Sequence, residues 1–258
     1  MTDSASASTP PVLAIIPARG GSKGIIRKNL REILGKPLLQ YPIETAQQSR
    51  FVDRIVVSTD DAEIGAMAEQ LGAEVVWRPA ELATDTALVI DAIRYTLGYL
   101  RERGYDPAVV TLLQTTSPLR RVADLDAAIE ALLAGRADSA ATFCELGESP
   151  HRIWRLDTDA GTAEPFITGA QPFLPRQQLP TGYYLNGQIY ALTPAILAAH
   201  PAAISILLGR PFPVITPRAL AVDIDEEADL LLAEQVLLRV GVPAPTPGAG
   251  AALPAPTA

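Results

Sequence analysis

The sequence predicts an α/β protein with a mostly parallel central sheet. Short apolar runs alternate along the chain with helical segments of about 10–15 residues, a pattern typical of βαβ units. The first apolar run, VLAIIP at 12–17, is continuous, as expected for a strand buried on both faces. With 258 residues, of which 48% are hydrophobic, the chain is long enough for one large domain with a substantial core.

The elements of this pattern can be placed in order. Strands are expected at 12–17, 54–59, 74–77, 109–114 and 138–143, and helices at 37–49, 61–72, 88–104, 122–135, 191–200 and 226–239. Gly72, Gly104 and Gly135 close three of the helices, because glycine takes the left-handed conformation at a helix C-terminus without steric cost. We therefore expect a single domain over residues 11–240.

Three segments depart from the alternation. Residues 1–10 and 241–258 are rich in Ser, Ala and Pro, and we expect both to be disordered. Residues from about 144 to 190 are rich in Pro, Gly, Arg and aromatics and show no helical period. We interpret this segment as an insertion, which is either a cover over an active site or an arm for dimerisation.

The composition excludes several classes of function. The net charge of −8, from 21 basic and 29 acidic residues, argues against a nucleic-acid partner or an anionic membrane surface. One cysteine, Cys144, and two histidines, His151 and His200, cannot make a disulfide framework or a Cys/His metal cluster. The first residues lack the pattern of a signal peptide, and no run of about 18 apolar residues is present. We expect a cytoplasmic protein with no membrane contact.

Positive charge nevertheless gathers after the first predicted strand. The stretch ARGGSKGIIRKN and the residues beside it hold five basic side chains and three glycines: Arg19, Lys23, Arg27, Lys28, Arg31, Gly20, Gly21 and Gly24. Glycines let backbone N–H groups approach an anion, and basic side chains neutralise it. The spacing matches neither G-x-x-x-x-G-K-[ST] nor G-x-G-x-x-G. The stretch is either a phosphate site or an exposed basic turn.

Two further groups of polar residues are candidate sites. The predicted strand in VTLLQTTSPLR ends in Gln114, two threonines and Ser117, which either line a site at the sheet edge or form a turn and helix cap. Asp223 and Asp225 flank Ile224, so an extended backbone directs both carboxylates to one side. They either bind Mg²⁺ or cap the following helix. Together the three groups favour Mg²⁺-assisted chemistry on a nucleoside triphosphate.

Five segments in order, between residues 12 and 239, carry a family resemblance: ARGGSKGIIRKN, RPAELATDTA, TLLQTTSPLR, PRQQLPTGYYLNGQIYAL and VDIDEEADL. They resemble the CMP-sialic acid synthetases (acylneuraminate cytidylyltransferases) and their legionaminic and pseudaminic acid relatives. The resemblance implies a Rossmann-like three-layer fold, a small arm and a homodimer. It also implies an enzyme that, with Mg²⁺, transfers CMP from CTP to the anomeric hydroxyl of a nine-carbon acidic sugar and releases pyrophosphate.

The resemblance also implies a role for each matching residue. The residues that would hold the triphosphate are Arg19, Gly20, Gly21, Ser22, Lys23 and Lys28, and those that would line the nucleoside pocket are Arg78, Ala87 and the backbone of Pro17 and Ala18. The sugar would be bound by Gln114, Ser117, Asn186, Gly187 and Tyr190, and its carboxylate by Arg152 and Arg176. Asp223 and Asp225 would bind Mg²⁺. Arg19, Lys23 and Asp223 would be catalytic. Taken singly, Arg78 could end a strand, Tyr190 could belong to a hairpin core, and Arg152 and Arg176 could be solvated loop charges.

Some positions depart from the family pattern and leave alternatives open. Ile26 stands where the family usually has proline, and Leu88 and Val89 stand where relatives often have hydroxyl residues. The aromatic GYYLNG, with Leu185 before Asn186, is closer to the legionaminic-type relatives. The alternatives are a GTP-using, sugar 1-phosphate or Kdo nucleotidyltransferase, an RNA-binding module, and an inactive regulatory homologue.

Overall fold

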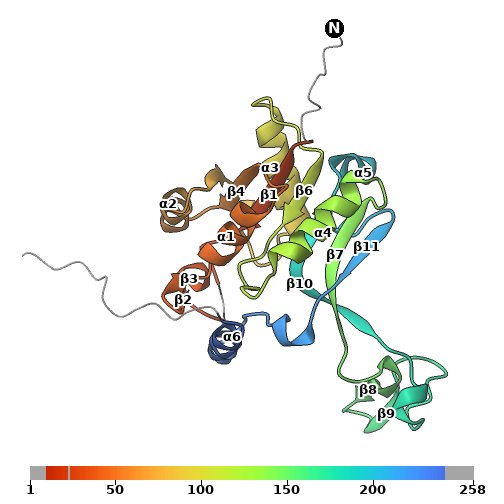
Figure 1. The fold of residues 1–258 in the computed structure, drawn as a ribbon. Coiled ribbons are helices and arrows are strands. Elements are labelled where there is room, and N and C mark those ends of the chain that lie inside the picture. The colour runs from red at the N-terminus through yellow and green to blue at the C-terminus, as the bar shows by residue number, and fades with distance from the viewer. Residues whose placement is uncertain (1–9, 23, 242–258) are drawn as a thin grey trace, which may run out of the picture.

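A seven-stranded sheet forms the centre of the protein in the computed structural model, which describes residues 10–22 and 24–241 (Figure 1). Its strands, in spatial order, are β11 (Pro211–Ile215), β7 (Ser139–Glu145), β10 (Tyr183–Leu192), β6 (Val109–Leu112), β1 (Val12–Pro17), β4 (Arg54–Thr59) and β5 (Glu74–Trp77). All neighbouring pairs are parallel except those of β10, which runs antiparallel to β6 and β7. The expected mostly parallel α/β fold is confirmed.

Helices cover both faces of the sheet and complete three layers. The apolar residues of α1 (Gln40–Gln48), α2 (Ala62–Gln70) and α4 (Val122–Leu133) join one core cluster, and those of α3 (Val89–Arg101) and α5 (Pro194–Ala199) join another. Strand β1 enters both clusters, because Val12, Ala14 and Ile16 lie on one face while Leu13 and Ile15 lie on the other. This two-sided burial explains the continuous apolar run read in the sequence.

The local predictions mostly hold, and the exceptions have physical reasons. Gly72, Gly104 and Gly135 follow three helices with φ of 82°, 81° and 67°. Strands β10 and β11 were not expected. An Asn-Gly pair reads as a turn but here forms a bulge in β10, where the register shifts between Leu185 and Tyr190. Two prolines obscure β11, which tolerates them as an edge strand.

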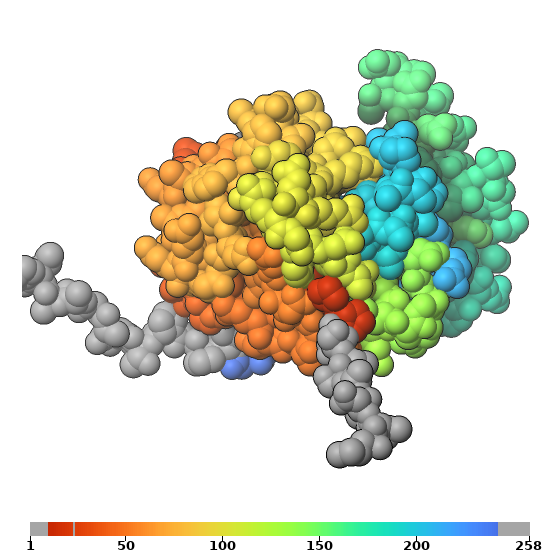
Figure 2. Space-filling model, turned by 90° about the horizontal axis from the view of Figure 1, so that it is seen from above, coloured from red at the N-terminus to blue at the C-terminus, as the bar shows by residue number. Residues whose placement is uncertain are grey.

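The insertion projects from the layered body between β7 and β10 (Figures 1 and 2). It carries the hairpin of β8 (Trp154–Asp157) and β9 (Thr162–Pro165) and two short 3-10 helices, η3 (Pro150–Arg152) and η4 (Arg176–Gln178). The expected bounds of about 144–190 were too wide, because β7 continues to Glu145 and β10 begins at Tyr183. We call residues 146–182 the arm.

A third apolar cluster fixes the basic loop, residues 18–31, beside the acidic segment, residues 222–226. It joins α6 (Glu227–Arg239) to the small hairpin of β2 (Glu32–Ile33) and β3 (Lys36–Pro37). Ile25 from the loop and Ile224 from the acidic segment are both buried in it, with exposed fractions of 1% and 0%. Short 3-10 helices complete the connections: η1 (Lys28–Leu30), η2 (Ala80–Leu82) and η5 (Arg218–Leu220).

The expectations for the two ends of the chain fall almost wholly outside the described residues, which include only Pro10 and Gly241 of the two tails. Within the described part, no helix combines the length and the apolar character that crossing a bilayer requires.

Candidate active site

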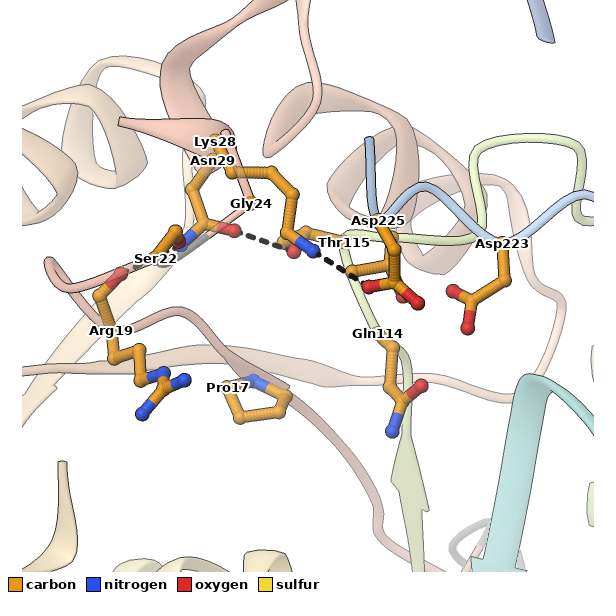
Figure 3. Close-up of a pocket in the computed structure, with 11 residues that line it drawn as sticks. Pro17, Arg19, Ser22, Gly24, Lys28, Asn29, Gln114, Thr115, Asp223 and Asp225 are labelled. Carbon is orange, nitrogen blue, oxygen red and sulfur yellow. Dashed lines mark hydrogen bonds and ion pairs between the residues drawn. The ribbon is translucent and has the colours of Figure 1, made fainter. Parts of the chain in front are cut away.

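A cavity of about 520 Å³ opens at the carboxyl ends of β1 and β6 (Figure 3). Its lining comes from the basic loop, the polar end of β6 and the acidic segment before α6: Pro17, Arg19, Ser22, Gly24, Lys28, Asn29, Gln114, Thr115, Thr116, Asp223 and Asp225. The three candidate groups of the sequence therefore lie around one cavity. Its position follows the general rule that ligands bind at the carboxyl edge of an open α/β sheet.

Two cations of the basic loop reach this cavity. Lys28 Nζ donates to the carbonyl of Ile224 at 2.7 Å and lies 3.2 Å from Asp225 Oδ1. Arg19 Nη2 lies 2.8 Å from Asp85 Oδ1. Both side chains line the cavity, so each can bind an anionic ligand there when its present contact is released.

Two other basic residues of the cluster, Arg27 and Arg31, pair with carboxylates away from the cavity. Arg27 pairs with Asp61 at 2.8 Å, and Arg31 forms a two-pronged pair with Glu227 at 2.6 and 2.9 Å. Lys23, expected to be catalytic, lies outside the described residues. The positive charge of the four described members of the cluster is thus divided between the cavity and two structural ion pairs.

The loop glycines allow close packing against acidic segments. A Cβ on Gly24 would lie 2.1 Å from the backbone oxygen of Asp225, and one on Gly20 would lie 2.6 Å from Asp61 Oδ2. The N–H of Gly20 donates to Asp60 Oδ1 at 3.1 Å, so this amide is not directed at the cavity as a bare donor. Gly21 has open space around it. The glycines therefore bring the loop onto its neighbours, and Gly21 alone of the three keeps free space beside it.

Asn29, which sequence reasoning did not single out, connects the loop to β6. Its Nδ2 donates to the carbonyl of Arg19 at 2.8 Å, and its Oδ1 accepts from Thr115 Oγ1 at 2.6 Å. The side chain is buried, so these two hydrogen bonds satisfy a group that would otherwise be costly to enclose. Its place in the quoted loop motif was the only signal in the sequence.

The two candidate metal ligands face a common space in the cavity (Figure 3). The helix-cap alternative does not apply to them, because Glu226 and Asp229 form the capping box of α6. Burial, and secondarily the charge of Asp225, raises the pKa of Asp223, while a hydrogen bond from Thr116 and the charge of Lys28 oppose this rise. A cation between the carboxylates would relieve their repulsion.

A smaller cavity of about 240 Å³ shares Pro17 and Arg19 with the first. It brings together Arg78 and Ala87, as expected for a nucleoside pocket, and adds Thr84 and Asp85, which sequence reasoning missed. Ala18 does not line it and is buried in the core. Arg78 is 9% exposed, its Nε has no hydrogen-bond partner among the described residues, and burial lowers its pKa despite the opposing charge of Asp60.

The residues expected to bind the sugar are only partly on the cavity surface. Gln114 lines it, and Gly187 approaches closely, since a Cβ there would lie 3.2 Å from Gln114 Oε1. The side chain of Asn186 points inward instead and donates to Thr216 Oγ1 at 2.6 Å, so its expected direct contact is not supported. Ser117 Oγ is buried and has no hydrogen-bond partner in the described part of the chain. Tyr190 is half-buried, and burial followed by the charge of Asp223 raises its pKa.

The two arginines of the arm do not line either of these cavities. Arg152 pairs with Glu148 at 3.1 Å and donates to the carbonyl of Pro172 at 3.2 Å. Arg176 is exposed and has no side-chain partner among the described residues. In the single chain, the arm carries these charges away from the cavity.

The layered fold and a cavity that combines cations, an amide and paired carboxylates define a nucleotide-dependent transferase. A sequence model described as cytidylyltransferase matches residues 13–196, and the chain belongs to this family. The expected relationship to CMP-sialic acid synthetases is confirmed.

Individual proteins show the same relationship. The chain is 34% identical over 184 residues to a CMP-N,N'-diacetyllegionaminic acid synthase of Legionella pneumophila, covering 70% of this chain and 78% of that protein. It is 45% identical over 109 residues to an N-acylneuraminate cytidylyltransferase of Escherichia coli, covering 42% of this chain and only 25% of that protein. The chain thus matches about a quarter of the length of the E. coli relative.

A solved structure of CMP:2-keto-3-deoxy-manno-octonic acid synthetase complexed with CTP has a similar fold. The TM-score is 0.66, the sequence identity 18%, and the match covers 89% of this chain and 99% of that one. At this identity the likeness shows a shared Rossmann-like fold and says nothing about the substrate.

Proposed function

We propose that this protein transfers CMP from CTP to the anomeric hydroxyl of a nine-carbon acidic sugar of the sialic or legionaminic type and releases pyrophosphate. The observation that carries the proposal is that Pro17 and Arg19 line both cavities, which makes the two cavities neighbours. The smaller cavity suits a nucleoside, and the larger one has cations for phosphates and an amide for an acceptor. A requirement for CTP favours a cytoplasmic location.

Each part of the site has a distinct task in this reaction. Arg78 is a buried donor for the base or ribose, and Arg19 and Lys28 offset the negative charge that develops on the leaving pyrophosphate. Gln114 lines the larger cavity and not the smaller one, and its amide provides a hydrogen-bonding group for the acceptor sugar. This group would orient the sugar for attack on the α-phosphate. No histidine lines either cavity.

The donor set at the acidic segment fits Mg²⁺. Two carboxylates, Asp223 and Asp225, line the cavity, and Mg²⁺ usually takes one or two carboxylates together with substrate phosphates. No group of three or more His, Cys, Asp or Glu side chains suited to a metal occurs among the described residues, so the nucleotide would complete the coordination. When bound, Mg²⁺ would polarise the α-phosphate and lower the pKa of the attacking hydroxyl.

We also propose that two copies form a dimer in which each arm reaches the partner's cavity. The arm exposes large apolar side chains, with Phe173 91%, Leu156 66% and Phe166 58% exposed. Such a group of exposed apolar residues favours a protein partner. Arg152 and Arg176 lie on the same arm, so the partner's arm could supply cations for the sugar carboxylate. Mixing Asp223→Asn protein with Arg176→Ala protein tests this proposal. Activity should return, because a mixed dimer combines the intact cavity of one chain with the intact arm of the other. A monomeric mass in light scattering would contradict the proposal.

The test of the reaction is pyrophosphate release by the purified protein with Mg²⁺. CTP and GTP are assayed separately with sialic acid, legionaminic acid and Kdo. We expect release with CTP and one nine-carbon acid, and its loss in Asp223→Asn. Asp106→Asn is the matched control. The carboxylate of Asp106 is exposed, pairs with Arg101 and does not line the cavity. Release only with GTP, only with Kdo, or with no pair would overturn the proposed substrates.

A further inference from the structure

A buried arginine behind the cavity has no assigned role. Arg120 is 7% exposed, and no carboxylate lies within ion-pair distance of it among the residues the structure describes. Its Nε donates to the carbonyl of Gln188 at 2.5 Å and its Nη2 to the carbonyl of Gln114 at 2.7 Å, while Nη1 has no hydrogen-bond partner within residues 10–22 and 24–241. Burial lowers the pKa of Arg120 to about 9.

Such an arrangement is unfavourable for stability alone. A buried guanidinium without a counter-ion is costly, and well-packed apolar residues often replace buried charges without loss of stability. Ser117 Oγ and Gln188 Oε1, on the same two segments, are also buried without partners in the described structure. Three of the described residues, each with an unsatisfied buried polar atom, therefore lie close together at a cost in stability. This cost indicates that Arg120 serves to position its neighbours rather than to stabilise the fold.

The two carbonyls that Arg120 contacts belong to the end of β6, which lines the cavity, and to the bulge of β10, which lies behind that lining. Gln114, at the end of β6, directs its side chain into the cavity (Figure 3). Gln188 lies in the bulge of β10 next to Gly187, whose φ is 75°. The bulge touches the cavity wall, because a Cβ on Gly187 would lie 3.2 Å from Gln114 Oε1. The distance between the two segments therefore sets where the Gln114 amide stands.

We propose that Arg120 is a positioning residue whose guanidinium holds the end of β6 against the bulge of β10 and so fixes the Gln114 amide for the acceptor sugar. The planar fork of a guanidinium reaches two carbonyls at once, whereas the single ammonium of lysine cannot keep both hydrogen bonds in the same geometry. Gln188 Nε2 also donates to the carbonyl of Leu220, which extends the connection toward the acidic segment. This inference rests on the proposed function.

The test compares Arg120→Met and Arg120→Lys with Arg121→Met as a matched control. Arg121 is the next residue, but it pairs with Asp124 at 2.6 Å and does not line the catalytic cavity. Steady-state KM for sugar and for CTP, kcat and Tm are measured for each protein. We expect Arg120→Met to raise the sugar KM at least tenfold, which is the size of effect expected when a positioning contact is lost. The CTP KM should stay within twofold of the wild-type value.

The control and the conservative variant separate positioning from folding. Arg120→Lys should lie between wild type and Arg120→Met in sugar KM, and Arg121→Met should lower Tm without changing either KM. An unchanged sugar KM, or equal rises in both KM values, would overturn the role. If Arg120→Met is insoluble, Arg120→Lys carries the test, and insolubility of both would show a folding role instead. An inactive wild type would count against the proposed function itself.

Discussion

Alanine at Gly24 should damage the site through one backbone contact. The added Cβ would lie 2.1 Å from the carbonyl oxygen of Asp225, and real Cβ contacts are essentially never shorter than 3.0 Å, so the loop and the acidic segment must separate by about 0.9 Å. Overpacking of this kind costs about 1–3 kcal/mol. In a chain of this size that corresponds to a fall in Tm of roughly 2–12 °C.

Catalysis should fall together with stability. Asp225 and Lys28 are held across the same contact, and a misplacement near 1 Å can cost on the order of 100-fold in rate. Calorimetry and pyrophosphate release measure the two effects. Gly21→Ala is the control for stability, because a Cβ there meets nothing within 4 Å and should change stability by less than about 0.5 kcal/mol. Equal Tm values for the two variants would refute the packing argument.

Three further changes test other parts of the structure. Asp223→Asn should reduce pyrophosphate release at least about 100-fold while Tm is unchanged or higher, since burial already disfavours its charged form; a lower Tm would contradict this. Arg78→Met should raise the CTP KM about tenfold or more with no loss of Tm in a thermal melt, because its buried Nε lacks a partner among the residues described. Tyr41 donates to the carbonyl of Ile33, and burial raises its pKa from 10.0 to about 12. The contribution of neutral Tyr41 to the free energy of unfolding is therefore complete below pH 10 and is lost as the pH rises toward 12. Urea unfolding at pH 9 and 11 should show a smaller decline in Tyr41→Phe, and equal declines would refute the assignment.

Much of the fold was predictable because its signals are local. The strands at 12–17 and 54–59 were placed at their observed bounds, since buried parallel strands are largely continuous apolar runs. The helix ends at Gly72, Gly104 and Gly135 followed from the freedom of glycine at positive φ. These choices depend on neighbours in sequence.

The strands that were missed depend on distant partners. Residues 183–192 contain an Asn-Gly pair that locally favours a turn, and β6 and β7 on either side hold them in the sheet. The extent of the arm was overestimated for the same reason. Secondary structure imposed by pairing leaves a weak pattern in the strand itself.

The candidate site shows the same division. Gln114, Asp223 and the basic loop could be associated from the sequence, because carboxyl ends of parallel strands share one edge of a sheet. The inward turn of Asn186, the pairing of Arg27 with Asp61, and the use of the Gly20 amide by Asp60 involve partners about 30 to 40 residues away. Their orientation could not be read from spacing.

The sequence by itself determined the α/β class, the family and the three segments that form the cavity, because periodicity and strand-end chemistry are written along the chain. Only the tertiary structure decided which charges face that cavity. A guanidinium such as that of Arg19, Arg31 or Arg120 can meet a ligand, a carboxylate or a carbonyl, and the choice depends on which acceptor the packed core brings within hydrogen-bonding distance.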